Sequence, residues 1–235
     1  MSISEDGLRK NQANFASLSP LSFLERTRKT FPNQTAIEYK DYKLSYKQAG
    51  QRCDALANLI KNQKFNSGST IAVMLPNIPV MWECHFGVPM AIGVLNAINT
   101  RLDSHTVQFI LEHGEAKLFI YDSEYSPIVE KALENLKNPP TVIEFVDEVA
   151  GNKRSNFANK VNCLDYETEL KNFIGTTFEH VLPNDEWNSI ALNYTSGTTG
   201  NPKGVVYHHR GAYLNAIGNS LTWDLPMHPK YLWTL

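Results

Sequence analysis

A stretch between residues 194 and 204 carries the residue types best suited to chemistry in this chain. It combines hydroxyl side chains, glycines and a lysine in the order Thr195, Ser196, Gly197, Thr198, Thr199, Gly200, Asn201, Pro202, Lys203. Glycine lets a backbone approach a ligand closely, and successive amide groups in such a turn can bind an anion. Hydroxyl groups add hydrogen-bond donors, Lys203 adds a mobile positive charge, and Pro202 restricts the backbone before it. This combination is suited to holding a polyphosphate.

Other interpretations of the same stretch are weaker. The Walker phosphate loop requires a glycine, four residues and then Gly-Lys-Ser/Thr. Counted from Gly197, the second glycine position holds Pro202, and Lys203 is followed by glycine, so that loop is excluded. A hydrolase site built from Ser196 and the histidines at 208–209 lacks the G-x-S-x-G turn. A surface linker shares the glycine and threonine content, and the residues alone leave that alternative open.

The elements expected around this stretch are strands and helices in alternation. An apolar run at 190–192 leads into the loop and a β-branched pair at 205–206 follows it, which predicts strand, loop, strand. Strands are expected at 71–75, within 91–98, at 117–121 and at 141–146, and helices at about 78–90, 104–114, 127–136, 166–173 and 212–221. This alternation predicts an α/β fold with a mostly parallel sheet and helices on both faces.

The first part of the chain has a different pattern. Residues 1–18 are polar and are expected to form a flexible N-terminus, and the polar residues 147–164 are expected to form a surface excursion. A helix at 20–31, short strands at 35–39 and 43–44, and a helix from Ser45 come next. Ser45 and Gln48 predict a capping box for that second helix. Its expected buried face holds Ala49, Cys53, Leu56, Ala57 and Ile60, which makes Cys53 a buried structural thiol.

Composition and charge narrow the class of protein. The hydrophobic content of 42% and charged content of 20% are ordinary for a globular domain. A net charge of -2 gives no electrostatic basis for binding nucleic acid. No apolar run approaches the roughly 20 residues of a membrane helix, so no membrane span is expected. The polar N-terminus lacks the apolar centre of a secretion signal, which predicts a cytoplasmic location. The three cysteines have no metal-ligand spacing.

The string from Thr195 to Gly204 resembles the signature of the AMP-forming adenylating enzymes, the superfamily of acyl-CoA synthetases, luciferases and peptide-synthetase adenylation domains. It matches that signature at every position, and Asn201 stands where the family varies. The similarity runs from about residue 20 to the last residue. Within the superfamily, residues 205–214 are similar to ligases of short and medium acids, including methylmercaptopropionate-CoA ligases and plant acyl-activating enzymes.

The resemblance implies a reaction in two steps. A small-molecule carboxylate attacks the α-phosphate of ATP to give acyl-AMP and pyrophosphate, and the thiol of CoA then displaces AMP. Because the first step brings two anions together, it depends on Mg²⁺ and on fixed donors. The residues implied to surround the β- and γ-phosphates are Thr195, Ser196, Gly197, Thr198, Thr199 and Gly200. Lys203 is implied to neutralise these phosphates as the catalytic lysine, and the Thr195 hydroxyl to face the magnesium.

The resemblance also implies that the chain is the N-terminal portion of a longer enzyme, with the C-terminal half absent. Residues 19–66 are then expected to be a small α+β unit that packs on a missing second subdomain, leaving an apolar patch exposed. Residues 67–235 are expected to be the first α/β subdomain, with the phosphate-binding loop at 194–204. The apolar run at 231–235 is interpreted as an interruption, and an edge strand docked into the sheet is the alternative.

Three functions are left open by the sequence. The first is ATP-dependent ligation of a short or medium carboxylic acid to CoA. The second is adenylation of an acid for loading onto a carrier protein. The third is a non-catalytic module or pseudoenzyme that binds nucleotide or its own full-length relative. The identity of the acid is also left open, and a homo-oligomer is one of the oligomeric states that the sequence allows.

Overall fold

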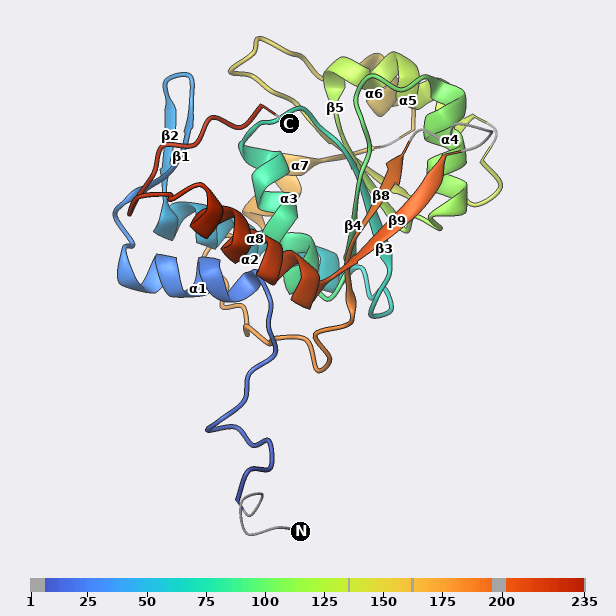
Figure 1. Cartoon of the computed structure of the whole chain (residues 1–235). Coiled ribbons are helices and arrows are strands. Elements are labelled where there is room, and N and C mark those ends of the chain that lie inside the picture. The colour runs from blue at the N-terminus through green and yellow to red at the C-terminus, as the bar shows by residue number, and fades with distance from the viewer. Residues whose placement is uncertain (1–6, 135, 162, 196–201, 235) are drawn as a thin grey trace.

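The computed structural model describes residues 7–134, 136–161, 163–195 and 202–234. Within these ranges lies a seven-stranded sheet with the strand order β7-β6-β5-β3-β4-β8-β9 (Figure 1). The strands are β3 (Thr70–Met74), β4 (Val94–Ala97), β5 (Leu118–Asp122), β6 (Thr141–Phe145), β7 (Leu164–Asp165), β8 (Ser189–Thr195) and β9 (Lys203–His208). Neighbouring strands are parallel except β8 and β9, which are antiparallel. The expected α/β fold with a mostly parallel sheet is confirmed.

Helices cover both faces of this sheet (Figure 1). One face carries α2 (Tyr46–Asn62), α3 (Pro79–Met90) and α7 (Tyr166–Lys171), and the other carries α4 (Ser104–His113), α5 (Ser126–Leu133) and α6 (Asn156–Lys160). Successive side chains of a strand point to opposite faces. In β3, Ile71 and Val73 therefore pack with α2 and α3, whereas Ala72 and Met74 pack with α4 and α5. All four are completely buried, as the continuous apolar run predicts.

The segment before the large sheet forms α1 (Leu21–Thr30), a hairpin of β1 (Thr35–Tyr39) and β2 (Tyr42–Ser45), and then α2. The predicted capping box is present: the Gln48 amide donates to Ser45 Oγ at 3.3 Å, and the Ser45 amide donates to Gln48 Oε1 at 2.9 Å. The predicted buried face of α2, which includes Cys53, is also confirmed. The exposed fractions are 0% for Ala49, Cys53, Leu56 and Ala57 and 3% for Ile60.

The apolar face of α2 has its packing partner within the described chain. A β-carbon built on Gly87 of α3 would lie 2.8 Å from Leu56 Cδ2, so the two helices approach closely there. Leu56 and Ile60 belong to the same hydrophobic cluster as β3 and α3. The helix α3 therefore covers the apolar face of α2. The packing of residues 19–66 on a missing second subdomain stays a prediction. A domain division at residue 66 stays a prediction.

The prediction of a surface excursion at 147–164 is wrong for its second half. The helix α6 and the strand β7 form there, and Phe157, Ala158 and Cys163 are buried beside α5. Ser155 begins α6, because its hydroxyl accepts a hydrogen bond from the Ala158 amide at 3.0 Å. Elements this short carry too few apolar residues to show a period, so the sequence does not reveal them.

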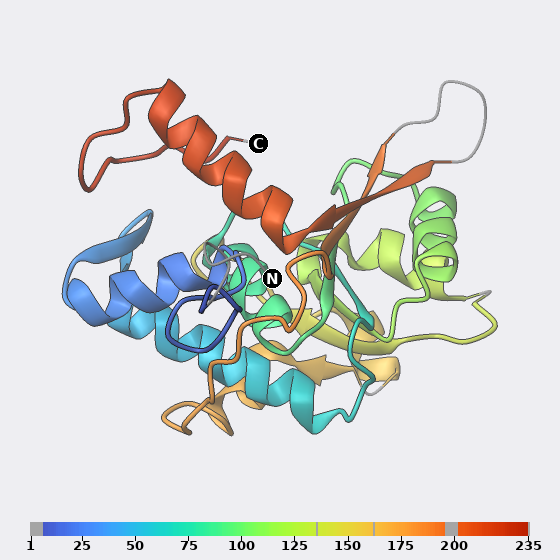
Figure 2. The ribbon, with the colours of Figure 1, turned by 60° about the horizontal axis from the view of Figure 1, so that its bottom comes forward.

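Exposed apolar side chains gather instead along β9, α8 (His209–Thr222) and the segment after it. They include Val206, Leu214, Leu221, Trp223, Met227 and Leu232. Figure 2 shows α8 on the outside of the molecule beside α1, where Phe23 and Tyr213 stack with ring centroids 4.7 Å apart. The described residues 230–234 form no strand, so the alternative of a docked edge strand is wrong for them. No helix in the described ranges is long and apolar enough to cross a membrane.

Candidate phosphate-binding site

The two ends of the predicted phosphate-binding loop lie side by side in a hairpin. The strands β8 and β9 pair with Thr195 opposite Lys203 and Tyr194 opposite Gly204. Figure 2 shows these two strands reaching outward together. The strands expected on either side of the loop are therefore confirmed. Of the expected site residues, Thr195 and Lys203 are described, whereas Ser196, Gly197, Thr198, Thr199 and Gly200 lie outside the described residues.

The loop end of this hairpin, where Thr195 and Lys203 lie, is at the carboxyl edge of the parallel strands. The strand β8 is parallel to β4, with Leu95 opposite Ala191, so both strands end toward the same edge. Ligands of open α/β sheets bind at that edge. Lys203 is exposed at the start of β9, so its ammonium group is accessible to an anion. This geometry is compatible with phosphate binding between the ends of the hairpin.

The described residues offer few ligands for a metal ion. Among them, no group of three or more His, Cys, Asp or Glu side chains could hold one. Thr195 could supply one neutral oxygen. Mg²⁺ usually keeps several waters and binds through substrate phosphates together with one or two protein ligands. The Thr195 hydroxyl therefore fits an ion that arrives with ATP and does not make a resident metal site.

Tyr194, the first residue of the predicted 194–204 loop, makes a contact that the sequence did not reveal. Its hydroxyl oxygen lies 2.7 Å from Nδ1 of His113, the last residue of α4. Its ring also meets the rings of His113 and Phe109 edge-on, with centroids 5.7 and 6.4 Å apart. Burial raises the pKa of the Tyr194 phenol, which keeps it a neutral hydroxyl. Because Tyr194 and His113 are 81 positions apart, no local pattern joins them.

The histidines at the other end of β9 have structural partners. His208 Nδ1 accepts a hydrogen bond from the Gly211 amide at 2.8 Å and so begins α8. His209 is 4% exposed, and its Nδ1 lies 2.8 Å from Ser19 Oγ just before α1. These contacts give both imidazoles a structural role, so no catalytic role is needed to account for their positions. They favour a phosphate-binding hairpin over a hydrolase site.

The stability of the protein is expected to depend on pH through His209. Burial lowers the pKa of His209 to about 4, whereas an unfolded histidine titrates near about 6.5. Between these values the unfolded chain binds more protons, so the free energy of unfolding falls as pH falls. His209→Gln keeps a polar partner for Ser19 but does not titrate. Urea unfolding across this window should show a smaller fall for His209→Gln, and equal falls would contradict the assignment.

A charge cluster lies between α2, α3 and α7, where Arg52 joins the completely buried Glu83 and Tyr166 to the partly exposed Glu167. The Arg52 guanidinium donates to both carboxylate oxygens of Glu83, at 2.5 and 3.2 Å, and to Glu167 at 2.5 Å. The Tyr166 hydroxyl donates to Glu83 Oε2 at 2.8 Å. Burial raises the pKa of the completely buried Glu83, although Arg52 opposes that shift. Because both oxygens of Glu83 are paired, we interpret this cluster as structural.

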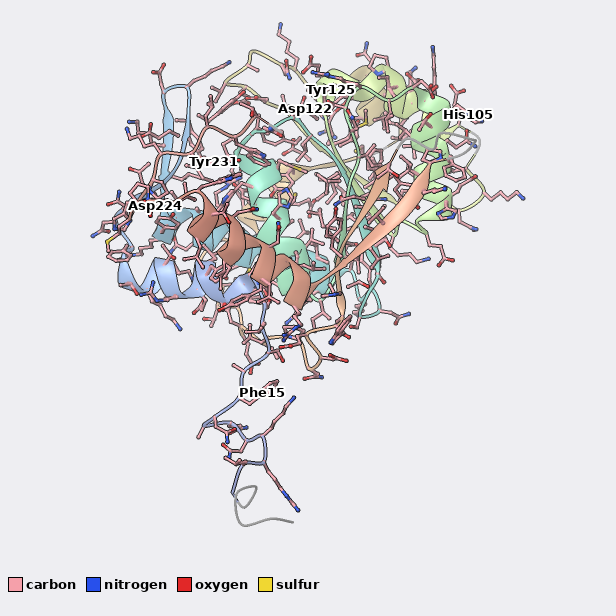
Figure 3. All side chains as sticks on the ribbon, in the orientation of Figure 1. Phe15, His105, Asp122, Tyr125, Asp224 and Tyr231 are labelled. Atoms are coloured by element: carbon pink, nitrogen blue, oxygen red, sulfur yellow. The ribbon has the colours of Figure 1, made fainter. Side chains whose placement is uncertain are left out.

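A further buried carboxylate, Asp122, lies at the end of β5 near Tyr125 (Figure 3). Its Oδ1 accepts hydrogen bonds from the Glu124 amide at 2.9 Å and from Asn152 Nδ2 at 3.0 Å. Burial raises the pKa of this carboxyl. The Glu124 contact begins the 3₁₀ turn at Ser123–Tyr125, so the described contacts of Asp122 order the chain after β5.

The family comparison agrees with this geometry. The profile of the AMP-binding enzymes matches residues 24–235, a range that includes the β8–β9 hairpin and the whole sheet. The chain belongs to the AMP-binding enzyme family. The resemblance read from the 195–204 string is thereby confirmed.

Curated relatives in this family match nearly all of the chain. Acetate–CoA ligase CCL3 of Humulus lupulus is 39% identical over 237 residues, which cover 98% of this chain and 42% of that protein. Acetate/butyrate–CoA ligase AAE7, peroxisomal, of Arabidopsis thaliana is 38% identical with the same coverage. Trans-cinnamate:CoA ligase, peroxisomal, of Petunia hybrida is 38% identical, also with that coverage. The chain thus spans about two fifths of the length of these relatives.

Two solved structures with the same fold are named as CoA ligases. The anthranilate CoA ligase AuaEII in complex with anthranoyl-AMP matches with a TM-score of 0.74 and 21% identity, over 86% of this chain and 37% of that one. A putative long-chain-fatty-acid CoA ligase from Rhodopseudomonas palustris matches with a TM-score of 0.73 and 17% identity, over 89% and 49%. At these identities the likeness shows the fold, which is that of the N-terminal part of the large domain of AMP-forming ligases.

Proposed function

We propose that this chain serves in the ATP-dependent activation of a short- or medium-chain carboxylic acid to acyl-AMP and then acyl-CoA. The observation that carries the proposal is the β8–β9 hairpin, which pairs Thr195 with Lys203 at the carboxyl edge of the sheet. Relatives named as acetate– and butyrate–CoA ligases support the substrate class. Their names also favour CoA over a carrier protein as the acceptor.

The proposed part of residues 1–235 in this reaction is to hold the triphosphate of ATP. Residues 195–200 would surround the β- and γ-phosphates with hydroxyl and amide donors, and Lys203 would place a positive charge against them. Mg²⁺ bound to ATP would add further charge neutralisation, with the Thr195 hydroxyl as its protein ligand. Repulsion between the carboxylate and the negatively charged phosphates is the electrostatic obstacle to acyl-AMP formation. Offsetting the phosphate charge lets the carboxylate approach the α-phosphate.

Two further expectations belong to this proposal. We expect a cytoplasmic location, and the relatives named as peroxisomal supply the alternative of a peroxisomal one. A non-catalytic module that binds nucleotide is the alternative for the activity, and turnover separates it from an enzyme. The oligomeric state stays a prediction.

Calorimetric titration of residues 1–235 tests the proposed binding step. Magnesium-ATP and magnesium-tripolyphosphate are expected to bind with similar affinity, because the hairpin would hold the phosphate tail and not the adenine. Adenosine is expected to compete with neither. Binding of adenosine without tripolyphosphate, or of neither compound, would overturn the proposal.

Pyrophosphate release in the presence of acetate or butyrate tests the chemical step separately. For residues 1–235 alone we expect phosphate binding without sustained release, because the described residues include no group of three or more His, Cys, Asp or Glu side chains that could hold a metal ion beside Thr195 and Lys203. Release that depends on the acid would instead make this chain an enzyme by itself. In both cases the binding experiment decides whether the hairpin is the phosphate site.

A further inference from the structure

We propose that Tyr194, held by His113, is a positioning residue that sets the two ends of the phosphate-binding hairpin, Thr195 and Lys203, for a polyphosphate. The inference rests on the proposed function and adds to it a residue outside the 195–204 string. Tyr194 would act through the backbone of the hairpin and would not touch the ligand.

The first observation is that the described pairing of β8 with β4 stops before Tyr194. The described register between β4 and β8 pairs Leu95 with Ala191, three positions before Tyr194. Beyond that point β8 pairs with β9, the strand at the edge of the sheet. A two-stranded ribbon of this kind is marginally stable by itself in water. A side-chain contact from the ribbon to the body of the protein would therefore limit its movement.

The second observation is that Tyr194 makes this contact with a well-packed helix. His113, whose Nδ1 lies 2.7 Å from the Tyr194 hydroxyl, ends α4. The same helix buries Val107, Ile110 and Leu111 in the core between it and the sheet. The Tyr194–His113 hydrogen bond thus joins the ribbon to an element that is itself fixed.

The third observation is that two glycines lie close to the Tyr194 ring, one in β9 and one after α4. On Gly204, opposite Tyr194 and next to Lys203, an added β-carbon would lie 3.5 Å from Tyr194 Cζ. On Gly114, next to His113, an added β-carbon would lie 3.3 Å from the Tyr194 hydroxyl and 2.8 Å from the Ile110 carbonyl oxygen. The ring therefore lies between the start of β9 and the end of α4, and its position is coupled to both.

The expected consequence is pre-organisation. A binding segment that is already held in its bound arrangement loses less conformational entropy when the ligand arrives. With the Tyr194–His113 hydrogen bond present, Thr195 and Lys203 keep their paired positions before phosphate binds. Without it, part of the binding free energy would be spent on ordering the end of the hairpin, so affinity would fall while the charge of the site stayed the same.

Four variants test this inference in the chain of residues 1–235, with magnesium-tripolyphosphate as the probe. Tyr194→Phe and His113→Leu are each expected to weaken binding about three- to tenfold, the range that loss of one hydrogen bond allows. The double variant should lose no more than either single variant, because both remove the same bond. His113→Gln, whose amide oxygen can accept from the tyrosine hydroxyl, should recover part of the affinity.

Tyr39→Phe is the matched control. The Tyr39 hydroxyl donates to Asp147 Oδ2 at 2.6 Å, so this variant also removes one tyrosine hydrogen bond. Asp147 follows β6, which lies on the other side of the sheet from β8 and β9. A purely structural role for Tyr194 predicts equal behaviour of Tyr194→Phe and Tyr39→Phe, with thermal unfolding changed and phosphate affinity unchanged. Should Tyr194→Phe unfold, His113→Leu and His113→Gln carry the comparison.

The outcomes separate this inference from the proposed function. If the unchanged chain binds no tripolyphosphate, the phosphate site itself is wrong. If it binds and Lys203→Ala abolishes that binding, while Tyr194→Phe and His113→Leu bind as well as the unchanged chain, the positioning role alone is overturned. Additive losses in the double variant would also overturn it, because they would show that the two side chains act independently.

Discussion

Replacing Lys203 by alanine is expected to weaken binding of magnesium-ATP and magnesium-tripolyphosphate by residues 1–235 about ten- to a hundredfold. A hydrogen bond to a charged group contributes roughly 1.5–3 kcal/mol, and each 1.4 kcal/mol is a factor of about ten. Lys203 is exposed and pairs with Thr195 through its backbone, so its side chain is free to reach an anion. The variant should lose affinity for the triphosphate group and keep its fold. Calorimetric titration measures it.

Controls for this experiment separate the position of Lys203 from charge in general. Lys47→Ala removes an exposed lysine from α2 and should leave both affinities unchanged. Lys203→Arg keeps the charge and should lose less than Lys203→Ala. Raising the salt concentration should weaken binding to the unchanged chain more than binding to Lys203→Ala, because it screens the charge that the variant lacks. Affinity of Lys203→Ala within twofold of the unchanged chain would exclude Lys203 from the site.

The regular part of the fold could be predicted because each element carries its own local signal. The strand β3 is a continuous apolar run whose neighbours are parallel strands, and all its residues from 71 to 74 are completely buried. The start of α2 is indicated by Ser45 and Gln48, whose spacing predicts the capping box that the structure contains. Such signals lie within one turn or one strand, so the sequence alone reveals them.

The features that the sequence did not reveal depend on distant partners. The apolar face of α2 packs against α3, which approaches it at Gly87, where the absence of a side chain allows close approach. The elements at 156–165 are short, and what orders them is burial of Phe157 and Cys163 beside α5. Neither contact has a counterpart in the local pattern of residues.

At the candidate site, too, the sequence revealed the contiguous residues and did not reveal their distant partners. The string from Thr195 to Lys203 is contiguous, so its chemistry could be read directly, and the structure places its two ends opposite each other. The side-chain contacts at the two ends of β9 join residues that are far apart in the chain. His113 is 81 positions from Tyr194, beside the start of β9, and Ser19 is 190 positions from His209, just after its last residue. A tyrosine just before a glycine-rich string and a histidine just before a helix-ending glycine were the available signals, and neither suggests the other.

Removing Arg52 is expected to have the largest effect on stability. Arg52→Met would leave the completely buried Glu83 with the Tyr166 hydroxyl as its remaining partner in the cluster. Breaking a buried pair by deleting one member typically costs about 3–5 kcal/mol, because the other charge stays buried and uncompensated. For a chain of this size that corresponds to a fall in Tm of roughly 10 °C. Thermal and urea unfolding at neutral pH measure the loss.

An exposed ion pair supplies the matched control. Lys43 and Glu38 are 3.3 Å apart in the β1–β2 hairpin, and their side chains are 61% and 45% exposed. Exposed pairs of this kind typically contribute about 0–1 kcal/mol, so Lys43→Met should change stability little. If Arg52→Met were no more destabilising than Lys43→Met, the charge cluster would not contribute to stability as its geometry indicates.

The pH dependence of Arg52→Met identifies Glu83 as the cause. Burial already raises the pKa of Glu83, and Arg52 is the main influence that opposes this rise. Without Arg52 the pKa of folded Glu83 should rise further above the unfolded value of about 4.3. The folded variant then binds more protons than its unfolded chain between those two values, so its stability falls as pH rises through them and recovers as pH is lowered. Adding Glu83→Gln to Arg52→Met should abolish this dependence and restore much of the stability, whereas a pH-independent loss would point to altered packing of α2.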